Sequence, residues 1–404
     1  MAKDLSIIVA GGGIAGLTAA LALASRGNRV TVLDKAERIQ PIGAGIQLSP
    51  NAIRILDNLG VADDLRYSAT VPQGIQVVSA RNARPVTTIP LGADAIAKYG
   101  LPYFTIHRPD LHAALLAACE TNPDIEIKTS TRVSDATQHR NGVSILHMNG
   151  SRPETMSCDL LVGADGIWST IRHELFAYKP AGFSGRDAWR ALIPAEKVPS
   201  SIDMDFTRLV LARNTHGVFY PVSAGRYLNL VIVAPAKTTE SKAGRQNTDV
   251  EELIGKLGGW HSSLQDLMRL GSSWSTWPMF TITETRGALQ NKWHNGSAVL
   301  IGDAAHGMLP FAAQGAAMGI EDAAILAECV SRGDGLQKAL AQYSTLRLPR
   351  VQKVARLSRR NGELYHMGWP FSLMRDLTMR FTPPGLFLKR QDWIYRWRTQ
   401  DSIA

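Results

Sequence analysis

The chain has 404 residues, of which 45% are hydrophobic and 20% are charged, a composition typical of a globular protein large enough for two or three domains. A formal net charge of +9 is spread along the sequence without a nucleic-acid-binding signature, so we expect a general attraction for small anions and no nucleic-acid partner. No apolar run reaches the length of about 18 residues that a membrane span needs, so we expect no stable membrane insertion. Cys119, Cys158 and Cys329 are far apart in the sequence, so we expect reduced thiols, no metal site and a cytoplasmic location.

The N-terminal residues predict a strand, a glycine turn, a helix and a second strand. β-Branched residues over 5–10 indicate a buried parallel strand, and Ala and Leu over 14–26 indicate a helix. Residues 29–33 repeat the strand pattern and end at Asp34. This order is typical of the first half of a dinucleotide-binding unit.

The turn between that strand and helix contains three functional glycines. Gly11 permits the tight turn, Gly13 lets the backbone approach a pyrophosphate, and Gly16 lets the helix pack closely on the strand. The N–H groups of the first helical turn would face the phosphates, and Asp34 would accept hydrogen bonds from a ribose. The motif therefore predicts a dinucleotide site, but it does not separate NAD from FAD.

A second glycine-containing loop follows. Ser49 is expected to cap a helix that has Pro50 at its first position and ends at Gly60. Before that helix, Gly43 and Gly45 would let the backbone run close to a flat ligand. An ordinary surface loop is the alternative.

Two further strands end in acidic turns. Residues 159–163 lead into Asp165-Gly166, and Ser169 and Arg172 open the next helix, so Asp165 would reach a ribose or a pyrophosphate-bound water unless the turn is only structural. Residues 297–301 end at Gly302-Asp303, where Asp303 is well placed for a ribityl hydroxyl because ligands lie outside the carboxyl ends of parallel strands.

A helix is predicted from Gly315 to about Arg332. Its first N–H groups would face the negative charge of a reduced isoalloxazine ring. Between the two acidic turns the pattern changes to short strands over 208–212, 217–222 and 227–234, which indicates an antiparallel sheet inserted into the α/β domain.

These motifs, together with His107-Arg108-Pro109, resemble those of group A flavoprotein monooxygenases of the aromatic hydroxylase family over about residues 5 to 365. The pattern is similar to salicylate hydroxylases, 3-hydroxybenzoate 6-hydroxylases and 6-hydroxynicotinate 3-monooxygenases, and residues 310–315 look closer to the latter two. The resemblance implies an α/β fold with a doubly wound FAD-binding domain of the glutathione-reductase-like Rossmann type and an inserted antiparallel substrate-binding sheet. The implied limits are 1–72, 103–178 and 286–362 for the FAD-binding domain, 73–102 and 179–285 for the substrate-binding sheet domain, and 363–404 for a C-terminal helical and aromatic tail.

The implied activity is FAD-dependent hydroxylation. NADH or NADPH, docking transiently, would reduce FAD, and dioxygen would form a flavin C4a-hydroperoxide that hydroxylates a small phenolic or hydroxy-heteroaromatic acid. Decarboxylating hydroxylation of the salicylate 1-hydroxylase type, another FAD-dependent oxidoreductase and a non-catalytic flavoprotein remain alternatives. An NAD-dependent dehydrogenase would leave residues 302–315 without a role. We expect a monomer or a homodimer.

The resemblance also implies site residues. His216 and Tyr220 match a His-x-x-x-Tyr-Pro segment, and residues four apart in a strand face the same way. His216 would remove the substrate's phenolic proton, because phenolate is the better nucleophile, and Arg190 could hold a carboxylate. A purely structural role is the alternative for His216 and Arg190, and packing is the alternative for Tyr220. His306 is expected to orient the Gly-Asp loop. The expected catalytic residues are His216, Gln314 and Tyr220; the substrate contacts are Gln47, Arg190, His216, Tyr220, Pro310 and Gln314; the cofactor contacts are Gly11, Gly13, Ile14, Ala15, Gly16, Asp34, Lys35, Gly45, Gln47, Arg108, Asp165, Asp303, Pro310, Gly315 and Ala316.

Overall fold

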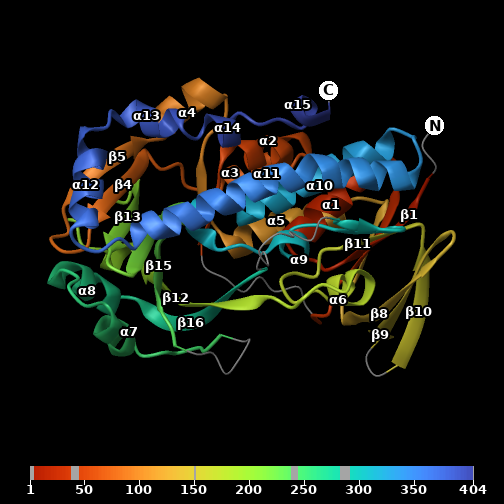
Figure 1. Ribbon diagram of the computed structural model, residues 1–404, viewed down its shortest axis with the longest axis horizontal. Coiled ribbons are helices and arrows are strands. Elements are labelled where there is room, and N and C mark those ends of the chain that lie inside the picture. Colours follow the sequence, from red (N-terminus) through yellow and green to blue (C-terminus); the bar gives the residue numbers. More distant parts are fainter. Residues whose placement is uncertain (1–3, 38–44, 150–151, 238–243, 283–291, 404) are drawn as a thin grey trace.

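The computed structural model describes residues 4–37, 45–149, 152–237, 244–282 and 292–403. Two large sheets lie toward opposite ends of an elongated molecule, and one long helix runs between them (Figure 1). The expected class, an α/β domain with an additional sheet, is confirmed. Gly43 of the predicted glycine loop lies outside the described residues.

The first sheet is the parallel core of the N-terminal unit. Its six strands run in the order β17-β18-β11-β1-β2-β7, and all neighbours are parallel except β17 and β18. The four strands predicted from β-branched runs lie at its centre, where both faces are covered. The strands are β1 (Ser6–Ala10), β2 (Arg29–Leu33), β7 (Ile125–Lys128), β11 (Leu160–Gly163), β17 (His294–Asn295) and β18 (Ala298–Leu300).

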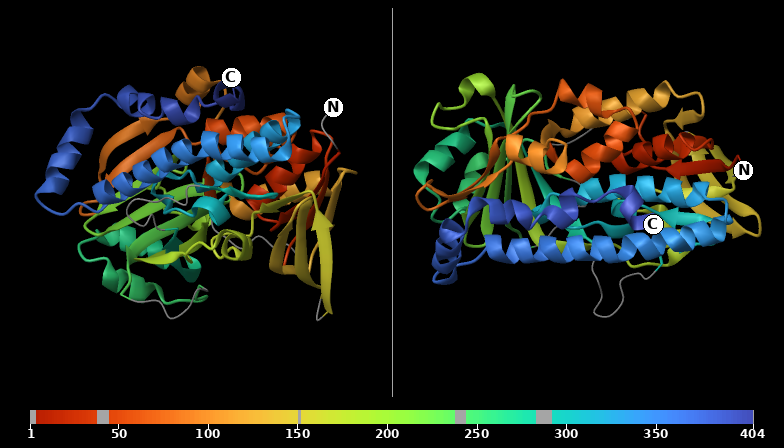
Figure 2. Two further views of the ribbon diagram at one scale, coloured as in Figure 1. Left: turned by 45° about the vertical axis from the view of Figure 1, so that its right-hand side comes forward. Right: turned by 90° about the horizontal axis from the view of Figure 1, so that it is seen from above.

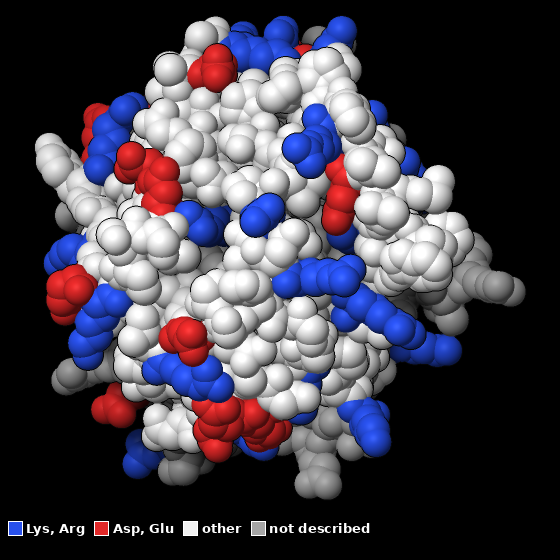
Figure 3. All heavy atoms as spheres, turned by 90° about the vertical axis from the view of Figure 1, so that its left-hand side faces the viewer, with Lys and Arg blue, Asp and Glu red and all other residues white. Residues whose placement is uncertain are grey.

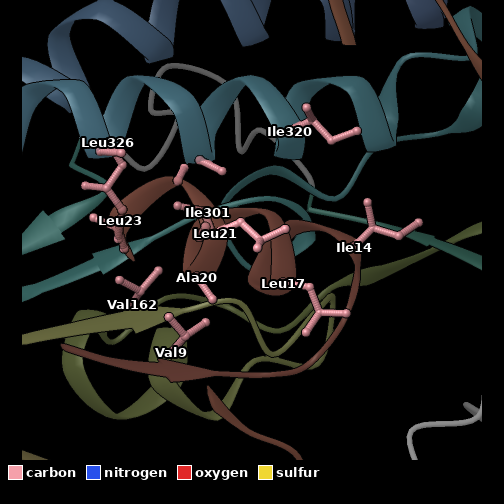
Figure 4. Close-up of a cluster of buried hydrophobic side chains, with 14 of the residues drawn as sticks. Val9, Ile14, Leu17, Ala20, Leu21, Leu23, Val162, Ile301, Ile320 and Leu326 are labelled. Atoms are coloured by element: carbon pink, nitrogen blue, oxygen red, sulfur yellow. The ribbon is translucent and has the colours of Figure 1, made fainter. Parts of the chain in front are cut away.

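Helix α1 (Ile14–Ala24) lies between this sheet and α10 (Gly315–Ser331), as Figure 4 shows. Val9 and Val162 approach it from the strands, and Ile320 and Leu326 approach it from α10. Nearly every residue of α1 is buried because it has protein on both sides, which explains its continuous Ala and Leu sequence. The α10 boundaries agree with the predicted helix.

A three-stranded antiparallel sheet in the order β10-β9-β8 extends from the same unit, and the sequence did not predict it. Most side chains of β8 and β10 are polar and at least partly exposed, so they lack the apolar runs that indicate buried strands. The remaining elements of this half, with the ribbon β3–β6, are β8 (Thr131–His139), β9 (Gly142–Asn149), β10 (Arg152–Cys158), β3 (Gly45–Leu48), β6 (Phe104–His107), α2 (Pro50–Asn58), α3 (Ala62–Arg66), α5 (Arg108–Glu120), α6 (Thr170–Phe176) and α9 (Asp303–His306).

The second large sheet has seven strands in the order β16-β12-β15-β14-β13-β4-β5. It is not purely antiparallel, because β4, which comes from the segment before Arg108, pairs in parallel with β13. Trp189, Phe219 and Leu230 on one face pack against α7 and α8. The elements are β4 (Gly74–Ser79), β5 (Pro85–Pro90), β12 (Gly182–Pro194), β13 (Phe206–Ala212), β14 (Thr215–Val222), β15 (Tyr227–Pro235), β16 (Ser272–Thr281), α4 (Gly92–Tyr99), α7 (Val250–Lys256) and α8 (Ser262–Arg269).

Helix α11 (Leu336–Tyr365) runs along most of the length of the molecule, which is clearest in the right-hand view of Figure 2. The tail then folds back over β5 and α2 as α12 (Phe371–Phe381), α13 (Pro384–Lys389), α14 (Asp392–Tyr395) and α15 (Thr399–Ile403). On the face at the α12 end, acidic and basic side chains are interspersed (Figure 3). Among the described residues, no helix has both the length and the apolar character needed to cross a bilayer.

Candidate active site

The two glycine motifs, far apart in the sequence, meet in the structure. Gly302 has a φ of +57°, and a Cβ atom there would lie 2.9 Å from the Cβ of Ala15. A Cβ atom at Gly319 in α10 would lie 3.0 Å from the same atom. The first turn of α1, the Gly-Asp loop and α10 therefore meet with only the Ala15 methyl group between them. We call the continuous surface formed by the 11–16 turn, the Gly302-Asp303 loop and the start of α10 the cradle.

Each glycine of the N-terminal turn has a different environment. Gly11 has a φ of +111°, and a Cβ atom at Gly16 would lie 1.9 Å from the Gly11 carbonyl oxygen, so both positions require glycine. A Cβ atom at Gly13 would meet no protein atom within 4 Å. Gly13 is also the N-cap of α1 and provides no side-chain cap to the first turn. The turn is thus tight against the protein and open above Gly13, as a phosphate site requires.

Two side chains hold the glycine turn from opposite sides. Asp34 accepts hydrogen bonds from the N–H groups of Gly12 and Ala36, both at 2.8 Å. The Nε2 atom of His112 lies 2.7 Å from the Gly12 carbonyl oxygen, so it carries the proton and donates. Burial lowers the pKa of His112, which keeps the ring neutral. Asp34 retains lone pairs for a ribose, and Lys35 beside it is exposed. No sequence motif had singled out His112.

The Asp-Gly turn is tied to the Gly-Asp loop. Asp165 accepts hydrogen bonds from the Ser169 hydroxyl at 2.5 Å and the Thr170 N–H at 2.6 Å, so its carboxylate holds the start of α6. Arg172 is buried and donates to the carbonyl oxygens of Ile167 at 2.6 Å and Ala304 at 2.9 Å. Arg172 was expected only to open a helix, but it joins the two motifs. A direct contact between Asp165 and a ligand stays a prediction.

Asp303 lies at the mouth of the cradle. It is exposed at the start of α9, and its negative charge acts on both Arg108 and Arg172. Desolvation lowers the pKa of Arg108, and Asp303 opposes that shift, so the two side chains lie near each other. Arg108 and Pro310 are both exposed, and Gly315 and Ala316 form the first turn of α10, where a Cβ atom at Gly315 would meet no described atom within 4 Å.

A buried ion network anchors the Gly-Asp loop from behind. Asp322 accepts hydrogen bonds from the Gly302 N–H at 2.9 Å, His306 Nε2 at 2.5 Å and Arg347 Nε at 2.7 Å. Burial alone would raise the pKa of Asp322, but His306 and Arg347 outweigh it and hold that pKa below its usual value. Arg347 also pairs with Glu321 at 2.7 Å. His306 thus lies where its expected orienting role requires, and part of the basic excess of the chain is internal.

The side chain of Gln314 is buried and hydrogen-bonded to this network instead of pointing into an open pocket. Its side chain is 2% exposed, and its Nε2 atom donates to the Ser49 hydroxyl at 2.9 Å. Ser49 donates to Asn51 at 2.5 Å, and Asn51 donates to Glu321 at 2.7 Å. Ser49 precedes α2 as predicted, but its hydroxyl makes no cap hydrogen bond because Asn51 and Gln314 occupy it. One amide hydrogen of Gln314 is left for a substrate, and that role stays a prediction.

One face of the seven-stranded sheet collects the expected substrate residues. In β14, His216 pairs with Val233 and Tyr220 pairs with Asn229, while in β12 Arg190 pairs with Val231. Because paired residues in neighbouring strands face the same way, His216, Tyr220 and Arg190 share one face, as the four-residue spacing predicted for the first two. Trp189 faces the opposite side, against α7 and α8.

Tyr220 is fixed in place by the ribbon above it. A Cβ atom at Gly45 would lie 2.4 Å from the Tyr220 ring, so only glycine allows β3 to pass this closely. Gln47 accepts a hydrogen bond from the Tyr103 hydroxyl at 2.6 Å and contacts the Tyr220 hydroxyl. Burial raises the pKa of Tyr220 and outweighs the opposing effect of Arg190, so the phenol remains protonated at neutral pH.

Arg190 makes no side-chain hydrogen bond to any residue that the structure describes, and its Nε atom is buried without a partner. Burial lowers the pKa of the guanidinium, and Tyr220 opposes this effect. The residue is partly buried, and a buried N–H without an acceptor is costly unless a ligand supplies one. The arrangement therefore favours an anionic group on this face of the sheet.

His216 is 2% exposed and lies among aromatic rings that the sequence did not single out. Its ring meets Phe311 edge-on, with ring centroids 5.1 Å apart, and Tyr365 at 5.3 Å. Its Nδ1 atom lies 2.8 Å from Nε2 of His366. Burial lowers the pKa of His216 well below its usual value, and His366 and Arg186 add to the effect, so the imidazole is neutral.

Comparisons with known proteins agree with this geometry. A family described as FAD binding domain matches residues 4–358. The 3-hydroxybenzoate 6-hydroxylase of Klebsiella oxytoca is 33% identical over 404 residues, which cover 100% of this chain and 99% of that protein. The 3-amino-4-hydroxybenzoate 2-monooxygenase PtnB3 of Streptomyces platensis is 34% identical over 391 residues, which cover 96% of this chain and 95% of that protein. A solved salicylate hydroxylase–substrate complex has the same fold, with a TM-score of 0.82 at 23% identity over 99% of this chain and 97% of that one.

Proposed function

Because the chain belongs to the FAD-binding domain family, we propose that its substrate is a hydroxybenzoate-type acid, bound with its carboxylate at Arg190 and its hydroxyl at His216. The protein is a FAD-dependent aromatic monooxygenase with NAD(P)H as its reductant. An NAD-dependent dehydrogenase is excluded by this membership and would leave the Gly-Asp loop unused. The two curated relatives described above are both named for benzoates that carry a ring hydroxyl.

The cradle fits FAD. We assign the pyrophosphate to the open space above Gly13 and to the first N–H groups of α1, because no described atom lies within 4 Å of a Cβ at Gly13 and no described side chain caps the helix. The adenosine ribose belongs beside Asp34 and Lys35, and the ribityl chain belongs beside Asp303 and Arg108. Bound FAD, once reduced, supplies the activated oxygen for the ring. The remaining expected contacts of the flavin ring are Gly45, Gln47, Pro310, Gly315 and Ala316.

The observation that carries the substrate proposal is Arg190, whose side chain makes no hydrogen bond to a described residue. In the sheet, Arg190 is two strands from β14 at the level of Val218, so it stands roughly 10 Å across from the strand that carries His216. A benzoate that lies between them presents a carboxylate to the guanidinium and a hydroxyl to the imidazole. A bidentate carboxylate would satisfy the buried charge.

His216 would act on the ring hydroxyl. A neutral imidazole has one unprotonated nitrogen, and it accepts a proton from a phenol that is held within hydrogen-bonding distance. The protonated Tyr220 would donate a hydrogen bond to the developing phenolate, and Gln314 would contribute its free amide hydrogen. The aromatic walls at Phe311 and Tyr365 limit water around these groups.

The test is a screen of aromatic acids for stimulated NADH oxidation, with product mass spectrometry. We expect one or more hydroxybenzoates to stimulate oxidation and gain one oxygen atom. Benzoate without a hydroxyl and phenol without a carboxylate are the matched controls, and both should give little product. Equal turnover of phenol would remove the carboxylate role of Arg190. Loss of carbon dioxide from the product would identify the decarboxylating alternative.

A further inference from the structure

The buried imidazole of His216 contacts a second imidazole, that of His366, which lies closer to the protein surface. The 2.8 Å separation between Nδ1 of His216 and Nε2 of His366 is a hydrogen bond with one proton, which either ring can hold. His216 is 2% exposed, whereas His366 is only partly buried at the end of α11. The pair therefore leads from the enclosed face toward solvent.

The structure holds both rings in place. The backbone N–H of His366 donates to the Gly362 carbonyl oxygen, and its own carbonyl oxygen accepts from the Asn214 N–H, both at 3.2 Å. A Cβ atom at Gly362 would lie 2.5 Å from the Phe311 ring, so the end of α11 is pressed against the residue that also meets His216. The contact between the imidazoles is thus fixed by β14, the 310–312 turn and α11 together.

The surroundings prevent His216 from keeping a proton. The groups that act on the pair are Arg186 of β12, which is positive, and Tyr365 of α11, which is neutral. Burial, with Arg186, lowers the pKa of His366 to about 4, and the pKa of His216 is also well below its usual value. A phenol, with a pKa near ~10, would not give its proton to such an imidazole unless the proton moved onward.

We propose that His216 and His366 form a proton relay that carries the proton of the substrate hydroxyl from the closed pocket to solvent. The proposal rests on the function of His216 proposed above. His366 acts through His216 and is a positioning and relay residue that does not touch the substrate.

The transfer is balanced in protons and bonds. The substrate O–H bond breaks as an N–H bond forms at Nε2 of His216, while the Nδ1–H bond of His216 breaks and an N–H bond forms at Nε2 of His366. His366 then releases its Nδ1 proton to water, and both rings stay neutral with their tautomers exchanged. When the hydroxylated ring regains aromaticity, the C–H bond at the hydroxylated carbon breaks and its proton goes to water, while the phenolic oxygen takes a proton back along the same path and the tautomers are reset.

Two substitutions of His366 separate relay from positioning. His366→Gln keeps a polar amide near the position of Nε2 and can still hydrogen-bond to His216, but it cannot accept and release a proton in one transfer. His366→Phe removes both abilities. His294→Gln is the matched control, because His294 is also a partly buried histidine hydrogen-bonded to a neighbour, Ser344 at 2.8 Å, but it lies in β17 outside the site.

The first measurement is stopped-flow proton release with a pH indicator when 3-hydroxybenzoate binds to the oxidised FAD-loaded enzyme. We expect both His366 variants to slow release at least tenfold and His294→Gln to match the original protein. The second measurement is hydroxylated product per NADH for fluorinated 3-hydroxybenzoates of increasing acidity. The defect of both His366 variants should shrink as the hydroxyl becomes more acidic, whereas a purely structural defect would not change.

The outcomes distinguish this proposal from the function on which it rests. Unchanged hydroxylation in His216→Asn would remove the base role and the relay with it. A slow His216→Asn with normal His366 variants would keep the base and overturn the relay. A normal His366→Gln beside a slow His366→Phe would mean that His366 only orients His216, which also overturns the relay.

Discussion

The polar groups at the two ends of the molecule are satisfied in different ways. In the cofactor cradle, Asp34, Asp165 and Asp322 each accept hydrogen bonds from the protein itself, and Asp322 accepts three. On the substrate face, Arg190 Nε and Asn229 Nδ2 are buried without partners among the described residues. The cradle also has buried nitrogens without a described partner, at His112 Nδ1, Arg172 Nε and His306 Nδ1, but its carboxylates are held by the protein, whereas Arg190 makes no side-chain hydrogen bond to a described residue.

This difference has an energetic meaning. A buried polar group without a hydrogen bond costs about 1–3 kcal/mol, which a correctly placed ligand group can recover. The carboxylates of the cradle already have protein partners, so substitutions that remove those partners should lower the free energy of unfolding. The substrate face should respond mainly in substrate binding. Four predictions test that division, beginning with the largest effect.

Asp322→Asn should break the anchor of the cradle. It leaves the buried Arg347 short of one charge partner and weakens the bonds to Gly302 and His306, so we expect the free energy of unfolding to fall by about 3–5 kcal/mol. Chemical denaturation of the FAD-free protein measures this change. Asp63→Asn, in an exposed pair with Arg66, is the control and should change it by less than about 1 kcal/mol. Equal effects of the two would contradict a buried anchor.

Two glycine substitutions divide folding from cofactor binding within one turn. Gly16→Ala places a Cβ atom 1.9 Å from the Gly11 carbonyl oxygen and should cost about 1–3 kcal/mol of unfolding free energy. Gly13→Ala meets no protein atom within 4 Å, so it should leave stability unchanged but weaken FAD binding. Flavin fluorescence titration and denaturation measure the two effects. A fully FAD-loaded Gly13→Ala protein would rule out the assigned phosphate position.

Arg190→Met should spare the fold and impair the substrate site. It removes a partly buried guanidinium that makes no hydrogen bond to a described residue, so stability should not fall. The KM for a hydroxybenzoate should rise about 10–100-fold, as expected when a charge-assisted hydrogen bond worth about 1.5–3 kcal/mol is lost. Steady-state NADH oxidation provides the measurement, and a phenol without a carboxylate should show no such rise. A parallel rise for that phenol would indicate a general distortion of the pocket.

The smallest effect concerns pH. The pKa of His366 is lowered to about 4, whereas an unfolded histidine titrates near ~6.5, so the unfolded chain binds more protons between these values. The stabilisation is complete above pH ~6.5 and is lost as pH falls toward 4. Because His366 is partly exposed and solvent screens its charge, we expect a share of only about 1 kcal/mol, less than the full shift would give. Denaturation across this range should show a smaller decline for His366→Gln than for the original protein. Identical pH profiles would contradict the lowered pKa.

The sequence predicted the residues that line the cradle better than the buried residues that hold those residues in place. Gly11, Gly13, Gly16 and Asp303 follow directly from local motifs, because a tight turn or a strand end restricts which residue fits. Arg172 and Asp322 could not be assigned roles in this way, because their partners come from other elements. The hydroxyl of Ser49 was assigned to a helix cap, but distant Gln314 competes for it.

The substrate face was only partly predictable for a related reason. His216 and Tyr220 were found because strand periodicity places them on one face. Their aromatic surroundings were not found, because Phe311 and His366 reach the sheet from the 310–312 turn and from the end of α11. No local periodicity relates these positions to β14.

Helix α11 is a rigid connection that sets the distance between the cofactor cradle and the substrate face. Arg347 anchors it at the cofactor cradle, and His366 follows its last residue at the substrate face. The 19 residue steps from position 347 to position 366 span roughly 28 Å at 1.5 Å each. Inserting one residue between them would rotate the far end by about 100° and carry His366 away from His216. The length of the helix therefore determines whether His366 reaches His216. An insertion of this kind would break the contact between the two histidines although no residue of either site had been substituted.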